Sequence, residues 1–278
     1  MSYKGWLIAV ILSIILIYGG IFLIRSMPPN FAEPPVYDIE KYGIPMFVDD
    51  DFIELDKIEY IKRYRSGLGI DTSDRFEECR DMQHLYIPFE EYRVDEEVKI
   101  YSPVNGSITS IFQVPVNQSG TWGQVEDNLI TIVYIQSFEY PAFTISLSLI
   151  DIRGMGLKYG SRVSAGQHLG YGCMRYKGKV ISVPWVRIGI SVNTPAGERR
   201  LSYFDVITDD VFQVYRDRGA TSRDDFIISK EDRDADPLEC TDAPNIWSST
   251  WIYDKGNILN WVYLRNDLGD FEIVSDYS

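Results

Sequence analysis

The stretch RVSAGQHLGYG at residues 162–172 indicates how the chain folds. Its glycines supply the positive φ that tight turns require, and together with Val163 they form the pattern of a hairpin that closes a small β-barrel. The stretch also contains His168, one of only two histidines in the protein. Because histidine is a common metal ligand, the stretch raises the question whether this barrel holds a metal site.

Strand patterns lie on both sides of this stretch, from about residue 84 to residue 208. VKIYSPVNGSITSIF (98–112) alternates around an Asn-Gly pair, which predicts a strand, a tight turn and a second strand. Further strand patterns are NLITIVYIQ (128–136), AFTISLSLIDI (142–152) and KVISVPWVRIGISVNTP (179–195). No helical pattern intervenes, so we expect a mainly β fold, an antiparallel hybrid barrel or sandwich.

The N-terminal region has the pattern of a transmembrane helix. Residues 5–24 contain no charged side chain, and at about 1.5 Å per residue they are long enough to cross a bilayer core. We predict an uncleaved signal anchor over residues 5–25, with residues 1–4 in the cytoplasm and the body of the chain outside the cell membrane. The alternative is a cleaved signal peptide, but MPPNFAEPP (27–35) offers no small-x-small cleavage site.

The charge balance limits the partners of the protein. The 278 residues carry a formal net charge of −14 at pH 7. Such a chain lacks the basic surface that neutralises nucleic-acid phosphates, so no nucleic-acid partner is expected. An acidic face could bind cations or basic partners, although a solvated surface is the simpler interpretation.

Composition divides the rest of the chain into three parts. Residues 26–79 begin as a proline-rich stalk and continue as a connecting segment, in which residues 51–67 have a weak helical pattern. Residues 80–208 form the predicted β-domain. Residues 209–278 form a small helical and aromatic C-terminal extension.

The C-terminal extension contains helix signals and an aromatic tail. DDVFQVYRDRG (209–219) predicts a helix that stops at Gly219, and Ser222 lies three residues before Asp225, as in a capping box. NIWSSTWIYDKGNILNWVYL (245–264) is expected to pack back onto the domain. The alternative is an exposed aromatic strip that binds a ligand.

Three cysteines are too few for a disulfide scaffold, and they lack the spacing of a metal site. Outside the cytoplasm one disulfide is plausible, and Cys79 and Cys240, both in polar surroundings, are the candidates. Such a bridge would tie the C-terminal extension to the start of the β-domain. Cys173, in the apolar sequence GYGCM, is expected to be a buried free thiol. The alternative is that all three cysteines are reduced.

Three segments together resemble a known family. IYSPVNGSITSI (100–111) and GLKYGSRVSAGQHLGYG (156–172) look like the opening and closing hairpins of a biotinyl/lipoyl-type hybrid barrel. VPWVRIGISVNTPAGERRLSYFDVI (183–207) resembles the last strand of the LytM-like zinc peptidases, peptidase family M23. The resemblance covers roughly residues 80–208. It implies a duplicated hybrid motif and a protein of the cell envelope.

The resemblance also implies that the zinc site is missing. The family's His-x-x-x-Asp motif falls on HLYIP, where His84 is kept but Pro88 replaces the aspartate. The terminal His-x-His falls on Trp185 and Arg187, and the auxiliary histidine falls near Ser148. His168 lies where the family has an aliphatic residue. We therefore expect a pseudo-peptidase without catalytic residues, metal or other cofactor, since catalytic zinc needs about three protein ligands.

The expected function is a non-catalytic, membrane-anchored binding or scaffold protein of the cell envelope. Its partner would be a cell-envelope polymer or a membrane protein, and the candidate groove residues are His84, Trp185 and Arg187. For His84 the simpler interpretation is a hydrogen-bonded residue at the barrel edge.

Two other functions remain open. One is a periplasmic-adaptor-like transport component or an accessory subunit of a membrane complex. Such adaptors insert a helical hairpin between barrel halves, whereas residues 112–156 have strand patterns and no heptads. The other is a hydrolase with an unrecognised site.

Overall fold

The computed structural model describes residues 34–67, 69–92, 98–115, 129–172, 175–176, 179–180, 185–242, 250–253, 259–264 and 271–274. The chain divides into two compact units, Met1–Pro35 and Val36–Ser278, and the fold below is that of the second unit. The predicted anchor at residues 5–25 and Cys173 lie outside the described residues. Among the helices that are described, none has the length and apolar character needed to cross a membrane.

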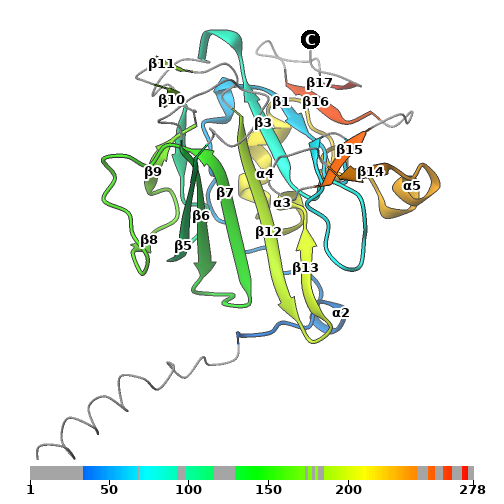
Figure 1. The fold of residues 1–278 in the computed structure, drawn as a ribbon, viewed down its shortest axis with the longest axis horizontal. Helices are drawn as coiled ribbons and strands as arrows, with labels where there is room; N and C mark the ends of the chain where they lie inside the picture. Colours follow the sequence, from blue (N-terminus) through cyan, green and yellow to red (C-terminus); the bar gives the residue numbers. More distant parts are fainter. Residues whose placement is uncertain are drawn as a thin grey trace, which may run out of the picture. The chain divides into compact units, whose positions relative to one another are not determined.

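A large antiparallel sheet dominates the fold (Figure 1). Its ten strands run in the order β17-β16-β1-β3-β12-β7-β6-β5-β8, and β13 pairs separately with β12. The strands of this sheet are β1 (Ile58–Lys62), β3 (His84–Pro88), β5 (Gly106–Pro115), β6 (Leu129–Ser137), β7 (Phe143–Ile150), β8 (Arg162–Val163), β12 (Val186–Thr194), β13 (Gly197–Leu201), β16 (Trp261–Leu264) and β17 (Phe271–Val274).

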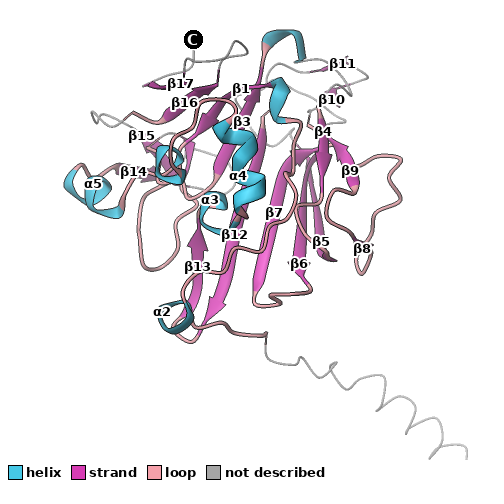
Figure 2. Cartoon of the chain, turned by 180° about the vertical axis from the view of Figure 1, so that it is seen from behind, coloured by secondary structure: helices cyan, strands magenta, loops and turns pink. Residues whose placement is uncertain are grey.

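Smaller elements surround this sheet. Strands outside it form three small sheets, β4 (Lys99–Tyr101) with β9 (His168–Tyr171), β10 (Arg175–Tyr176) with β11 (Lys179–Val180), and β14 (Glu239–Asp242) with β15 (Thr250–Tyr253) and β2 (Gly69–Ile70). The helices are α2 (Ile39–Tyr42), η1 (Leu55–Lys57), η2 (Glu90–Tyr92), α3 (Tyr203–Val206), α4 (Asp209–Arg216), η4 (Arg223–Phe226) and α5 (Lys230–Ala235). Figure 2 shows α3 and α4 lying across one face of the large sheet.

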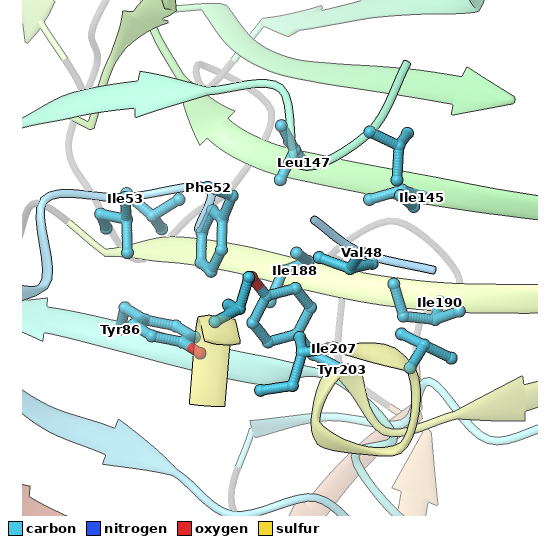
Figure 3. Close-up of a cluster of buried hydrophobic side chains, with 14 of the residues drawn as sticks. Val48, Phe52, Ile53, Tyr86, Ile145, Leu147, Ile188, Ile190, Tyr203 and Ile207 are labelled. Carbon is cyan, nitrogen blue, oxygen red and sulfur yellow. The ribbon is translucent and has the colours of Figure 1, made fainter. Parts of the chain in front are cut away.

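Most of the buried apolar side chains lie on the face that α3 and α4 cover. Along β12 the even-numbered residues point into this core, with Ile188 and Ile190 among them (Figure 3). The segment that contains Val48 and Phe52 crosses the same face and packs against Tyr203 of α3. A second, smaller cluster lies on the other face of β1, β3 and β16, and its buried members are Tyr60, Leu85, Ile87 and Trp261. Burial of both faces explains why β3 reads as a continuous apolar strand.

The two turn motifs that predicted a barrel lie against each other. Neither closes a hairpin of its own, because β4 pairs with β9 and β5 pairs with β8. Ser102 donates its N–H to the Gln167 carbonyl at 2.9 Å, and Gly166 donates to the Ser102 carbonyl at 2.8 Å. Gly166 has φ +73°, and a Cβ there would lie 2.8 Å from the Asp50 carboxylate. The positive φ of this turn therefore favours glycine, whereas the exposed Asp50 side chain could move away from a Cβ.

The mainly antiparallel β class was correctly predicted, but the sheet is open. Within the described residues β8 and β17 end the sheet and do not pair with each other. The large sheet also contains β1, β16 and β17, which come from segments outside the predicted β-domain of residues 80–208. A closed barrel of residues 80–208 is therefore replaced by a sheet that includes β1 on one side of β3 and β16 beyond it.

The weak helical pattern at residues 51–67 gave a wrong prediction. This segment forms η1 and then β1, which lies between β3 and β16. Tyr60 and Ile61 are both buried, on opposite faces of the sheet. The sequence of β1 therefore lacks the alternation of apolar and polar residues by which a half-buried strand is recognised. Residues from Val36 onward accordingly belong to the folded unit rather than to an extended stalk.

The C-terminal extension is helical only in its first half. Helix α4 forms as predicted, Gly219 has φ +98°, and Ser222 and Asp225 form a capping box at η4. After residue 238 the chain forms strands instead, and β16 pairs with β1 while β17 pairs with β16. Trp261 is completely buried in the second cluster, so this part of the aromatic tail packs onto the domain.

A disulfide joins Cys79 to Cys240, with the two Cα atoms 5.6 Å apart. Cys240 lies in β14, and Cys79 lies in the connection between β2 and β3. The bridge therefore ties β14 to the irregular segment that connects β2 with β3.

Candidate functional site

Three of the four positions where the M23 resemblance places histidines, Ser148, Trp185 and Arg187, lie on the outer face of the large sheet, opposite to the helices. In the strand register Arg187 lies directly across from Leu85 on β3 and from Ser148 on β7. Residues paired in this way point to the same face. Trp185, at the start of β12, packs against the second apolar cluster, to which Leu85 belongs. Trp185, Arg187 and Ser148 are therefore neighbours on one surface.

Arg187 is part of a buried ion cluster. Its Nη1 lies 3.2 Å from Oδ2 of Asp81, and Lys62 forms an ion pair with the same oxygen. Thr72 donates its hydroxyl to the other oxygen of Asp81 at 2.8 Å. Asp81 and Lys62 are almost completely buried, whereas 12% of the Arg187 side chain remains exposed. The cluster thus holds two cations against one carboxylate, and only Arg187 reaches the surface.

The Asp81 carboxylate compensates the two cations of this cluster only in part, because Lys62 and Arg187 also repel each other. Burial lowers the pKa of Lys62 to about 8, because the Asp81 carboxylate offsets only part of the cost of removing the ammonium from water. Burial by itself would raise the pKa of Asp81, but Lys62 and Arg187 outweigh it and hold that pKa below its usual value. Asp81 is therefore an ionised carboxylate whose oxygens are already occupied by two cations and a hydroxyl.

His84 lies on the opposite face from Arg187. In register it pairs with Ile188, whose side chain is in the main core, and its ring makes an edge contact with Phe204 at 5.0 Å. Its Nδ1 lies 3.0 Å from the Lys62 carbonyl, and its Nε2 lies 2.8 Å from the Ser202 hydroxyl. A carbonyl can only accept, so Nδ1 carries the proton and Nε2 accepts from the serine. Burial lowers the pKa of His84 to about 4, so the ring is neutral.

These residues do not fit a zinc ion. Both ring nitrogens of His84 are occupied, Pro88 has no ligand atom in its side chain, and Arg187 brings a positive charge to the place of a ligand. In the part of the chain that the structure describes, no group of three His, Cys, Asp or Glu is arranged to hold a metal. The other histidine, His168, donates its Nε2–H to the Gly170 carbonyl at 2.9 Å and packs against Tyr101 and Tyr171.

A strained residue lies beside Ser148. The register of β6 and β7 shifts at this point, where Thr131 pairs with Ile150 but Ile132 pairs with Ser148. The extra residue is Leu149, which has φ +67° and packs its side chain near the second apolar cluster. A branched residue in this conformation is uncommon, and such strain persists only where the surroundings enforce it. The bulge turns the end of β7 on the same face that carries Arg187.

A second buried carboxyl lies on the core face. Oδ1 of Asp51 accepts hydrogen bonds from the Phe52 N–H and from the hydroxyls of Tyr203 and Tyr215, at 2.8–3.1 Å. Burial raises the pKa of Asp51 to about 7, although the two tyrosine hydroxyls act in the opposite direction. This carboxyl is thus poised to titrate near neutral pH within the hydrophobic core.

The sequence did not identify Asp81 and Lys62 as site residues. Asp81 lies three residues before His84, but no motif marks it. Lys62 follows a segment that was expected to be helical, and in β1 it lies across from Trp261 on the outer face. A correct assignment of β1 as a strand would have placed Lys62 on the same face as Tyr60 and thus close to the site.

Comparisons with known proteins give weak similarities. No protein-family model and no curated protein matches the sequence. Among solved structures, Csd3 of Helicobacter pylori in a hexagonal crystal is 15% identical, with a TM-score of 0.32, over 61% of this chain and 37% of that chain. The same protein in an orthorhombic crystal gives 14% identity and a TM-score of 0.31, over 58% and 40%. The solution structure of lysostaphin gives 12% identity and a TM-score of 0.30, over 50% and 51%.

This chain therefore spans between 37% and 51% of the length of the solved structures that it matches. At these TM-scores the likeness does not establish a shared fold.

Proposed function

We propose that the protein is a membrane-anchored, extracytoplasmic binding or scaffold protein of the cell envelope, built on an M23-like β-domain that does not cleave its ligand. The observation that carries the proposal is the place of Arg187. It lies on the outer face of β12, at a position where the resemblance places a histidine, and its guanidinium is held there by Asp81. An arginine in this place repels a dication and suits an acidic group.

The binding surface would consist of Arg187 and Trp185, with Ser148 beside them. Arg187 offers guanidinium N–H donors to a carboxylate, and Trp185 offers a flat apolar side chain next to it. His84 is not part of this surface, because it points into the core. The ligand would be an acidic group of an envelope polymer or of a membrane-protein partner.

Binding can be tested with the full chain reconstituted in lipid vesicles. Isolated cell-wall polymer is incubated with the vesicles, and retained protein is compared for the parent chain, Arg187→Met and Trp185→Ala. We expect each variant to bind about tenfold more weakly, Arg187→Met because it loses a charge-assisted hydrogen bond and Trp185→Ala because it loses apolar contact area. Arg162→Met is the control, since Arg162 is an exposed residue of β8. If the partner is a membrane protein, crosslinking in the native membrane is used instead. Equal recovery of all partners with the parent chain and both variants would contradict the proposed binding surface.

The non-catalytic part of the proposal has its own test. Purified protein is analysed for bound zinc and for cleavage of cell-wall peptides. One zinc per chain together with turnover would overturn it. For anchoring, the test is alkaline carbonate extraction of membranes, in which we expect the protein to stay with the lipid.

A further inference from the structure

Exposed apolar side chains gather at one end of the folded unit. Val36, Tyr42, Ile44 and Met46 lie within a segment of eleven residues and are between 40% and 63% exposed. Phe138, in the turn from β6 to β7, is 50% exposed. These five make up half of the large apolar side chains that are exposed in the described part of the chain. We call them the α2 patch. Single exposed apolar residues are ordinary, but a cluster of this kind marks an interaction surface.

The segment that carries four of these residues is fixed to the domain at both ends. Tyr37 donates its N–H to the Asn193 carbonyl at 2.8 Å, and its ring packs against Phe143 with centroids 5.3 Å apart. Phe47 is buried and donates its N–H to the Val206 carbonyl at 2.8 Å. Between them Asp38 caps α2 by accepting the Lys41 N–H at 3.1 Å. The exposed side chains are therefore presented by an ordered backbone.

Phe138 belongs to the same end of the molecule. Tyr140, two residues later in the same turn, packs against Tyr37 at 5.9 Å and against Phe47 at 5.2 Å. Figures 1 and 2 both show α2 near the tip of the β12–β13 hairpin, at the end of the fold where the β6–β7 turn also lies. The two segments that carry the five residues thus lie at the same end of the fold.

We propose that the α2 patch rests on the surface of the lipid bilayer. This inference depends on the membrane anchor of the proposed function. Only the ten residues from Ser26 to Pro35 separate Arg25 from Val36, and even a fully extended chain of that length spans at most about 35 Å. The patch is thus tethered close to the membrane whenever the anchor is inserted. Tyrosine with neighbouring aliphatic side chains is the composition that favours the lipid–water interface.

The charges around the patch define the kind of lipid contact. The acidic side chains there are Asp38, Glu40 and Glu139. The basic ones are Lys41, Arg162, which lies over the Phe138 ring at 5.6 Å, and Arg199, whose guanidinium lies 3.8 Å from the Glu40 carboxylate. Because the acidic and basic groups balance, the patch has no net charge that would attract anionic headgroups. Contact therefore depends on the apolar side chains, and a zwitterionic bilayer is sufficient for it.

The test uses the full chain in phosphatidylcholine vesicles, with Cys173→Ser and a nitroxide attached at one introduced cysteine. Ile44→Cys reports on the patch, and Val214→Cys on α4, with a similar exposure of 44%, is the matched control. Accessibility of the label to oxygen and to a water-soluble nickel chelate is measured by power saturation. At residue 44 we expect at least about a threefold rise in the ratio of oxygen to nickel accessibility over residue 214, because oxygen concentrates in lipid.

The outcomes separate the inference from the anchor. Equal ratios at both positions, in protein that carbonate does not extract, would overturn the patch and leave the anchor intact. Low accessibility to both reagents at residue 44 would place a second copy or a protein partner there instead of lipid, and would also overturn it. Extraction of the protein by carbonate would refute the anchor, and the inference with it. Stronger contact on adding phosphatidylglycerol would contradict the apolar mechanism.

A variant adds a second readout. Tyr42→Ser, Ile44→Ser and Met46→Ser combined remove exposed side chains, so the fold is retained. In this background a nitroxide at Phe138→Cys is expected to lose its oxygen preference, while the label at Val214→Cys is unchanged. An unaltered label at residue 138 would show that the segment around α2 makes no contact of its own.

Discussion

Buried polar side chains are neutral on one face of the β3–β12 strand pair and charged on the other. On the core face, His84 is neutral, and both of its ring nitrogens form hydrogen bonds. On the outer face, Arg187, Lys62 and Asp81 remain charged and compensate one another. The comparison of the two faces shows that burial favours the neutral form of a titratable group that has no counter-ion. A buried group stays charged where an opposite charge is in contact with it. The two environments are one residue apart along each strand, because His84 pairs with Ile188 and the next residue, Leu85, pairs with Arg187.

The largest effect is expected from removing the central carboxylate of the outer face. Asp81→Asn leaves the Lys62 and Arg187 cations without it, so we expect a loss of about 3–5 kcal/mol in the free energy of unfolding, measured by urea denaturation. Combining Asp81→Leu with Lys62→Met and Arg187→Met removes all three charges and should restore most of it. A loss below about 1 kcal/mol for Asp81→Asn would show that the cluster is solvated.

On the core face, we expect His84→Ala to cost about 2–4 kcal/mol of unfolding free energy, because it removes two buried hydrogen bonds and opens a cavity beside Phe204. His168→Ala is the matched control, since this histidine is only partly buried and makes one hydrogen bond to the Gly170 carbonyl. Ligand binding should be unchanged in His84→Ala protein that is folded. If His84→Ala protein kept its stability but lost ligand binding, His84 would have to be part of the binding surface.

A smaller loss of stability is expected for Arg187→Met, about 1 kcal/mol by urea denaturation, because Asp81 keeps Lys62 and Thr72 as partners. This variant separates the roles of the two faces, since its main effect should be on ligand binding. If it destabilised the protein as much as Asp81→Asn, the arginine would serve the fold rather than a ligand.

The pH dependence of stability gives the finest test of the core face. The pKa of His84 is lowered to about 4 in the folded protein, so the unfolded chain binds the proton more tightly between about pH 4 and 6.5, and stability rises with pH there. The pKa of Asp51 is raised to about 7, so the folded protein binds the proton more tightly between about pH 4 and 7, and stability falls with pH. Each slope is at most about 1.4 kcal/mol per pH unit, and the two oppose each other.

Single variants should uncover these slopes. In Asp51→Asn protein, thermal stability should rise from pH 4 to 6.5 more steeply than in the parent, and in His84→Gln protein it should fall over the same range. Asp205, whose pKa burial raises to about 6, adds to the falling component in both. Identical pH profiles for the parent and both variants would mean that neither group changes its pKa on folding.

The sequence predicted what local chemistry determines. Gly166 marked a real turn, the capping box of Ser222 formed, and the β-class of residues 98–195 was correct, whereas Gly106 begins β5 and the hairpin predicted around it did not form. Pairing was not readable, because the partners of β4 and β5 are set by tertiary contacts between two turn motifs that are far apart in the chain. β1 escaped recognition because both of its faces are buried and it ends in a lysine.

For the candidate site, the resemblance implied a groove lined by His84, Trp185 and Arg187, and the structure places Arg187 and Trp185 on one face together with Ser148. His84 was assigned to the same groove from its motif alone. The register of β3 against β12 puts it on the other face, and sequence spacing within one strand cannot reveal the register of its neighbour. Asp81 lies in an irregular segment, where no periodicity exists to indicate its burial.

The place of β1 in the sheet has a consequence for how the chain acquires its structure. One neighbour, β3, follows within about thirty residues, but the other, β16, ends at Leu264, about two hundred residues later in the chain. The meander of β5, β6 and β7 and the β12–β13 hairpin join sequence neighbours and can form early. We expect β1 to complete its pairing last, because closing long loops slows folding. During synthesis, one edge of β1 therefore stays unpaired until β16 has been made, and a chaperone that covers strand edges would act in that interval.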